Sequence, residues 1–268
     1  MKSNQKCTFS VLLILVVFSN VVYAQIDTVR FNKYYFKKYW TDSKSIVTAP
    51  FHWKQKDWIK FGVITSSVAA TVLVDQSVAE FSQKYRSTEL DHFSANFLEP
   101  FDVKYSFLLM GGFMAHGLLA KNNKSVSTGL LLLESYSLAM IFVRIPKNLI
   151  GRKRPDAWPP STPSDWDGPF RGVSFPSGHT TASFAVASVI ANQYRDHKWI
   201  PVTAYSVATL AGLSRIYENR HWLSDVIAGA AIGTFVGNLV SHRTSNSKLT
   251  VVPFGNGNFQ GVRLAYTL

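Results

Sequence analysis

Three short polar motifs, set among apolar stretches, hold the side chains of this chain that are best suited to chemistry. They are the segment 147–155 (KNLIGRKRP), the segment 176–179 (PSGH), and Ser214-Arg215 followed by His221 and Asp225. Together they supply two histidines, a carboxylate and several cations. Phosphoryl transfer chiefly needs a positioned nucleophile, a proton donor and positive groups around the phosphate oxygens. The pattern therefore predicts a site that holds a phosphate group and attacks it.

The first motif supplies cations. Lys147 and Arg154 are seven residues apart, which is two helical turns, so both would face one side if the helix continues to Pro155. Arginine binds phosphate with two parallel hydrogen bonds, whereas lysine acts as a point charge. Arg152 and Lys153 are expected to be bystanders at the rim of the site. Taken alone, the motif also fits a basic helix end that merely flanks a membrane.

The second motif precedes a helix-like run at 180–185. Ser177 can cap this helix, and the free N–H groups at a helix start attract anions. Gly178 would let the backbone approach a phosphate closely, and His179 would then lie beside the bound group, placed to protonate a leaving oxygen. A histidine at a helix start is by itself usually structural. The presence of the other two motifs favours the catalytic interpretation.

The third motif combines a cation with a histidine and a carboxylate. Ser214-Arg215 ends an apolar stretch, so Arg215 can face the same pocket. His221 and Asp225 are four residues apart, and such residues are neighbours on one face of a helix. The carboxylate would orient the imidazole, which makes His221 the candidate nucleophile. The alternative is a surface pair, but Asp225 falls within an apolar run at 222–240, where an unpaired carboxylate would be costly.

These motifs resemble the signature of the type-2 phosphatidic acid phosphatase superfamily: K-x6-RP, then PSGH, then SR-x5-H-x3-D. Every fixed position is met in order, over roughly the second half of the chain. The superfamily joins lipid phosphate phosphatases, bacterial class A acid phosphatases and vanadium haloperoxidases. The resemblance implies a phosphohistidine intermediate on His221, with His179 as the proton donor and Asp225 as the carboxylate that orients His221. It also implies that no metal or other cofactor is needed, and that the phosphate oxygens are held by Lys147, Arg154, Ser177, Gly178 and Arg215.

Composition limits the classes of partner. The 268 residues suit one large domain, with 47% hydrophobic, 14% aromatic and only 16% charged residues. The mean hydropathy of +0.05 is nevertheless low for a chain that is nearly all membrane span. A net charge of +12 favours anionic partners such as phosphates or acidic lipid headgroups. Nothing resembles a nucleic-acid module, so nucleic acid is not an expected partner.

The N-terminal part has two expected segments. Residues 1–24 are typical of a signal peptide, with Lys2 and Lys6, an apolar run at 11–18 and a small-residue cleavage site ending at Ala24; an uncleaved anchor is the alternative. The only cysteine, Cys7, lies within this segment. Residues 25–56 form an arm rich in basic and aromatic residues. This arm fits either a membrane interface or packing on the main domain.

The rest of the chain predicts an all-α fold. Six apolar stretches indicate a six-helix bundle: 58–74, 105–120, 126–145, 180–192, 200–213 and 222–240. They place the phosphatase domain at 57–243. In the tail, 244–268, three glycines separate short apolar runs, so a short β-hairpin is expected between Thr250 and Leu268.

Membrane topology has two competing indications. Several stretches are shorter than the ~20 residues that a span needs, and Glu134 interrupts the third. Positive turns at 121–124 and 195–198 would be cytoplasmic by the positive-inside tendency, which puts the motifs outside. Three spans after a cleaved signal would instead put them inside. We favour membrane embedding with the site facing the periplasm, and a globule at the membrane surface is the alternative.

The leading functional hypothesis is a cell-envelope phosphatase that acts on a phosphorylated lipid: a phosphatidate, an isoprenyl diphosphate or a lipid A phosphate. The alternative is a soluble periplasmic acid phosphatase of broad specificity. A vanadate-using haloperoxidase and a non-catalytic envelope protein are further hypotheses, and the complete set of motif residues weighs against the last. The loop at 158–175 leads into the site and is the expected place for substrate selection.

Overall fold

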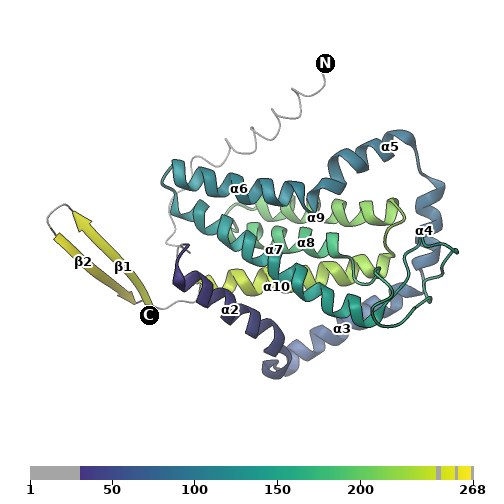
Figure 1. Ribbon diagram of the computed structural model, residues 1–268, viewed down its shortest axis with the longest axis horizontal. Coiled ribbons are helices and arrows are strands. Elements are labelled where there is room, and N and C mark those ends of the chain that lie inside the picture. Colours follow the sequence, from purple (N-terminus) through teal and green to yellow (C-terminus); the bar gives the residue numbers. More distant parts are fainter. Residues whose placement is uncertain (1–30, 246–248, 257–258, 267–268) are drawn as a thin grey trace, which may run out of the picture.

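The fold is built from long helices that lie side by side, with a two-stranded hairpin after the last of them (Figure 1). The computed structural model describes residues 31–245, 249–256 and 259–266, so the predicted signal peptide lies outside the described residues. The helices are α2 (Lys33–Thr48), α3 (Gln55–Val72), α4 (Asp75–Lys84), α5 (Thr88–Phe93), α6 (Lys104–Leu119), α7 (Asn123–Ile150), α8 (Gly178–Gln193), α9 (Trp199–Tyr217) and α10 (Leu223–Ser245). Three single turns are η1 (Ala49–His52), η2 (Ser94–Leu98) and η3 (Glu99–Phe101).

The prediction of an all-α fold is confirmed. Each of the six apolar stretches forms a helix, namely α3 and α6 to α10. The polar helices α2, α4 and α5 were not predicted, because their sequences lack a long apolar run. Strands β1 (Leu249–Asn256) and β2 (Phe259–Tyr266) pair antiparallel and form the expected hairpin.

The core lies where α7, α8 and α10 meet. Helix α8 packs against α7, α9 and α10, so it is enclosed on several sides. The buried apolar side chains come from all three helices: Leu131, Leu132, Leu138, Ala185, Val189, Val236 and Val240. Burial of such side chains is the main stabilising contribution to a helical bundle. This core fixes the ends of the helices that carry the three motifs.

Helices α8 and α10 approach unusually closely because one face of α10 is made of glycine. Gly229, Gly233 and Gly237 are spaced four apart and so lie on one side of the helix. A Cβ at Gly237 would lie 2.6 Å from the carbonyl oxygen of Ala185, and one at Gly233 would overlap the carbonyl oxygen of Thr181. The contact is therefore backbone against backbone. It holds the start of α8 next to the start of α10.

We expect Gly233→Ala to lower the melting temperature of the purified protein in detergent by several degrees. The added methyl group has no space, and overpacking of this kind costs about 1–3 kcal/mol. Gly62→Ala on α3 is the matched control and should not lower the melting temperature. A Cβ there meets no atom within 4 Å, and alanine stabilises a helix by about 1 kcal/mol relative to glycine. Equal melting temperatures for the two variants would contradict the close contact.

Helix α2 shows how the N-terminal arm is held. The hydroxyl of Tyr35 donates to the carbonyl of Leu130 on α7 at 3.2 Å. The ammonium of Lys38 pairs with Asp42 at 2.5 Å and with Glu134 of α7 at 3.3 Å. Glu134 is fully buried, so its place in an apolar helix is explained by this partner. The inner face of the arm thus packs on the bundle, as one of the two interpretations expected.

The helices also fit a membrane protein. Two of them are long and apolar enough to cross a membrane, Asn123–Ile150 and Leu223–His242. A third span results if α3 and α4, which are bent by 57° at a short break, count as one. No residue of α3 is buried, and its large side chains such as Trp58, Phe61 and Ile64 stay exposed. An apolar surface of this kind suits contact with lipid.

Candidate active site

Lys147 lies in the last turn of α7, and the following loop holds its side chain. Its Nζ donates to the carbonyl oxygens of Val173 at 2.6 Å and Ser174 at 3.3 Å. The side chain is buried, and these contacts use two of the three donors of an ammonium group. One donor of Lys147 is therefore available for a ligand.

The helix that carries Lys147 does not continue to Arg154, so the two cations do not share a helix face. Helix α7 ends at Ile150, and Gly151 follows with a left-handed backbone at φ 66°. A glycine in this position is a common end to a helix. Arg154 thus follows in the loop rather than on the same helix face as Lys147. Its Nε is buried and has no hydrogen-bond partner in the described part of the chain, so it can serve a bound anion.

The second motif starts α8 as predicted. The Oγ of Ser177 accepts a hydrogen bond from the backbone N–H of Thr180 at 3.4 Å, which makes Ser177 the N-cap. The N–H of Ser177 in turn donates to the backbone carbonyl of Asp225 at 3.0 Å and so joins the starts of α8 and α10. A Cβ at Gly178 would meet nothing nearer than 3.9 Å, so open space lies beside this residue.

His179 follows Gly178 in the first turn of α8, with 38% of its side chain exposed. Burial, and next the positive charge of Arg215, lower the pKa of His179 to about 3. The charges of His221, Arg154 and Lys147 add to this lowering. Three cations and both histidines of the motifs therefore lie close together, as the sequence predicted.

Arg215 reaches this cluster from the end of α9. Its guanidinium is buried and donates to Glu218 at 2.8 Å, and it also lies 3.8 Å from Glu99 of η3. The hydrogen bonds to Glu218 and to the hydroxyl of Ser214 orient the guanidinium. A planar, fixed fork of donors is the group that binds phosphate oxygens in pairs.

His221 and Asp225 form the predicted pair, but not on one helix. Helix α10 begins at Leu223, so His221 lies before it and Asp225 lies in its first turn. The Nδ1 of His221 is 3.4 Å from Oδ2 of Asp225, an ion-pair distance that is too long for a well-formed hydrogen bond. Burial lowers the pKa of His221, although Asp225 opposes the change. The ring is therefore neutral near pH 7, and its Nε2 keeps a free electron pair.

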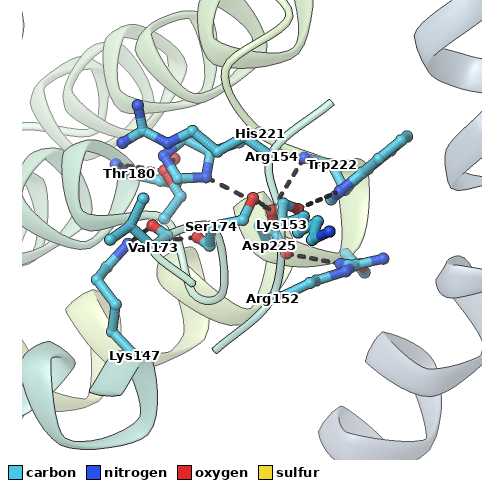
Figure 2. A network of polar contacts seen from close by, with 12 residues as sticks. Lys147, Arg152, Lys153, Arg154, Val173, Ser174, Thr180, His221, Trp222 and Asp225 are labelled. Atoms are coloured by element: carbon cyan, nitrogen blue, oxygen red, sulfur yellow. Dashed lines mark hydrogen bonds and ion pairs between the residues drawn. The ribbon is translucent and has the colours of Figure 1, made fainter. Parts of the chain in front are cut away.

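Asp225 is held at the centre of a buried network (Figure 2). Its Oδ2 accepts from the hydroxyl of Ser174 at 2.5 Å and from the N–H of Trp222 at 3.0 Å. Its Oδ1 accepts from Arg152 at 2.6 Å. A carboxylate with this many donors keeps one orientation, and it stays charged even when buried.

Arg152 was expected to be a bystander, and this prediction is wrong. The side chain is fully buried and also donates to Ser224 at 2.7 Å, to Asp75 of α4 at 2.7 Å and to the carbonyl of Pro163 at 2.9 Å. The rings of Trp166 and Trp222 lie 5.1 and 5.5 Å from the guanidinium. Lys153, by contrast, is partly exposed and pairs with Asp167 at 3.2 Å.

Sequence reasoning had no signal for the role of Arg152. Its partner Asp75 lies on a helix far away in the sequence, outside all three motifs. Asp75 also accepts from the N–H and the hydroxyl of Ser224, so it supports the start of α10 as well. Only folding brings Asp75, Arg152 and Asp225 together.

The arrangement is suited to phosphoryl transfer. A neutral imidazole lies beside a carboxylate and near the cations of the three motifs. In the described part of the chain, no group of three or more His, Cys, Asp or Glu side chains could hold a metal ion. The absence of a metal requirement stays a prediction.

Comparisons with known proteins agree with this geometry. Residues 128–248 match the model of the PAP2 superfamily. The chain is 49% identical over 67 residues to a lipid A 1-phosphatase from Porphyromonas gingivalis, a stretch that covers 25% of this chain and 15% of the relative. It is 32% identical over 120 residues to phosphatidylglycerophosphatase B from Bacillus subtilis, covering 42% and 56% respectively. The matched stretches thus span less than two thirds of either relative.

The fold matches a solved structure as well. A crystal structure of a transmembrane PAP2-type phosphatidylglycerolphosphate phosphatase from Bacillus subtilis superimposes with a TM-score of 0.56, at 21% identity. The match covers 71% of this chain and 95% of that one. Motifs, geometry and fold lead to one conclusion: residues 128–248 of this chain form a domain of the PAP2 superfamily.

Proposed function

We propose that this protein is a phosphatase that removes phosphate from a lipid through a phosphohistidine intermediate on His221. One observation carries the proposal. The buried, neutral imidazole of His221 lies beside Asp225 and near Lys147 and Arg154, and Arg215 lies near His179. This combination supplies a nucleophile and neutralises the oxygens of the group that it attacks.

In the first half of the reaction, Nε2 of His221 attacks phosphorus as the bond to the leaving oxygen breaks. The electrons of that bond go to the leaving oxygen, which takes a proton from Nε2 of the protonated His179 ring. Burial and the nearby cations lower the pKa of this ring in the free protein, and the negative charge of the bound phosphate opposes that lowering. Asp225 stabilises the positive charge that develops on the ring of His221. Lys147, Arg154 and Arg215, with Ser177 and the N–H of Gly178, hold the phosphoryl oxygens.

In the second half, water attacks phosphorus and gives a proton to His179. The P–N bond breaks, its electrons return to Nε2 of His221, and phosphate leaves. His179 therefore acts first as acid and then as base. The chemistry requires that the ring of His179 can reach the leaving oxygen, and its partial exposure at the edge of the site supports this role.

A lipid substrate is supported by the surface and by the relatives. The bundle carries exposed apolar side chains on α3, and two of its helices have the length and composition of membrane spans. Similar proteins include a lipid A 1-phosphatase and a phosphatidylglycerophosphatase. We place the protein in the cell envelope with its site facing the periplasm. The loop at 158–175, which supplies the carbonyl partners of Lys147, is the part of the site that we expect to select the lipid.

The test is phosphate release by the purified full chain in detergent micelles. The substrates are a phosphatidate, phosphatidylglycerophosphate, a lipid A phosphate, an isoprenyl diphosphate and a water-soluble phosphate ester. Faster release from lipids than from the soluble ester is the expected result. Equal or faster release from the soluble ester would favour a broad acid phosphatase instead. No release from any of them would overturn the proposal.

A further inference from the structure

A second carboxylate touches the second histidine. Asp102 lies in the turn between η3 and α6, far from the three motifs in the sequence, and its side chain is buried. Its Oδ2 is 3.1 Å from Nδ1 of His179. This contact is shorter than the 3.4 Å between Asp225 and His221. The site therefore contains two histidine–aspartate pairs from unrelated segments.

The contact determines which nitrogen of His179 can take part in chemistry. A carboxylate only accepts hydrogen bonds, so the neutral ring carries its proton on Nδ1, where it faces Asp102. Nε2 is then the free nitrogen. It can accept a proton from water, and when the ring is charged it can donate one to a leaving oxygen.

The other groups around His179 oppose a proton on its ring. Burial and the charges of Arg215, His221, Arg154 and Lys147 all disfavour the protonated ring. Burial raises the pKa of Asp102 to about 6, with Arg215 opposing, so this carboxyl is mostly ionised at neutral pH. Besides His179 and Arg215, Tyr136 of α7 is a titratable group near Asp102.

The nearby acidic groups do not replace Asp102. Glu218 and Glu99 both pair with Arg215, at 2.8 and 3.8 Å. In the described part of the chain, the ion-pair partner of Asp102 is His179. Asp102 is thus the carboxylate placed to stabilise a proton on this ring.

We infer that Asp102 is a positioning residue that holds His179 in its reactive tautomer and stabilises its protonated form during loss of the leaving group. This inference rests on the proposed function. The proton that reaches the leaving oxygen comes from Nε2 of His179, and Asp102 stays ionised throughout. The same contact keeps Nε2 free to take the proton of water in the second half of the reaction.

The test uses Asp102→Asn, which keeps the shape of the side chain and removes its charge. We compare kcat/KM for an alkyl phosphate, whose alcohol leaves poorly, with kcat/KM for a nitrophenyl phosphate, whose phenolate needs no proton. Since kcat/KM covers the steps up to release of the alcohol, it isolates the donation of the proton. We expect a loss of about 100-fold on the alkyl ester and only a few-fold on the nitrophenyl ester.

Three comparisons make this result specific. The ratio of the two rates comes from one sample, so a reduced fraction of folded protein does not change it. His179→Ala should show the same selective loss, and Asp102→Asn should cost nothing more on the alkyl ester when His179 is already alanine. Glu89→Gln removes an exposed carboxylate on α5 and should leave both rates unchanged.

Each failure has a different meaning. Equal losses on the two esters, or additive losses in the double variant, would overturn the role of Asp102 while the wild-type protein still releases phosphate. If the wild-type protein released none, the proposed function would fail, and this inference would fail with it.

Discussion

His221→Ala is expected to lower phosphate release by about 10⁴-fold or more, because it removes the nucleophile that forms the P–N bond of the intermediate. Lys147, Arg154 and Arg215 would still bind the substrate, so KM should change much less than kcat. Rapid acid quenching of the wild-type protein during turnover should trap phosphate bound to protein in an acid-labile form. The variant should trap none.

His242→Ala is the matched control for His221. His242 lies near the end of α10, is exposed, and has Nδ1 2.8 Å from the carbonyl of Asn238 within its own helix. Its loss should leave turnover unchanged. If His221→Ala kept a tenth of the wild-type rate, or still formed the phosphoenzyme, another group would have to be the nucleophile.

Arg152→Gln is expected to lower the free energy of unfolding by about 3–5 kcal/mol, the range found when a buried ion pair loses one partner. Asp75 and Asp225 are fully buried, and Arg152 is the cation that pairs with both. Without it, both buried carboxylates would lose the cation that they share. The orientation of Asp225 would also be less fixed, so kcat should fall as well.

Two further variants separate these effects in unfolding measurements by heat or denaturant in detergent. Arg220→Gln breaks a partly exposed pair with Asp156 and should change stability by at most about 1 kcal/mol. Adding Asp75→Asn to Arg152→Gln removes one uncompensated charge and should restore part of the lost stability. If Arg152→Gln were no more harmful than Arg220→Gln, the buried network would not be a main support of the site.

Much of the site and of the helical fold could be predicted from the sequence. The three motifs predicted which side chains meet, since Lys147, Arg154, Ser177, His179, Arg215, His221 and Asp225 depend on residue type and spacing within short segments. The six apolar stretches predicted the main helices, because a helix with an apolar face must pack against others. Local chemistry also predicted Ser177 as the cap of α8.

Three features were decided by tertiary structure alone. Arg152 is buried in the loop after α7 because the fold brings Asp75 and Asp225 beside it. Asp75 and Asp102 reach the site from segments outside the motifs, and Asp102 does so from a short turn with no apolar pattern. A lone aspartate has the same appearance in a sequence whether it faces water or a histidine. Its partner is set by the packing of whole helices. The residues that we propose to do the chemistry can therefore be found in the sequence, whereas those that hold them in place need the fold.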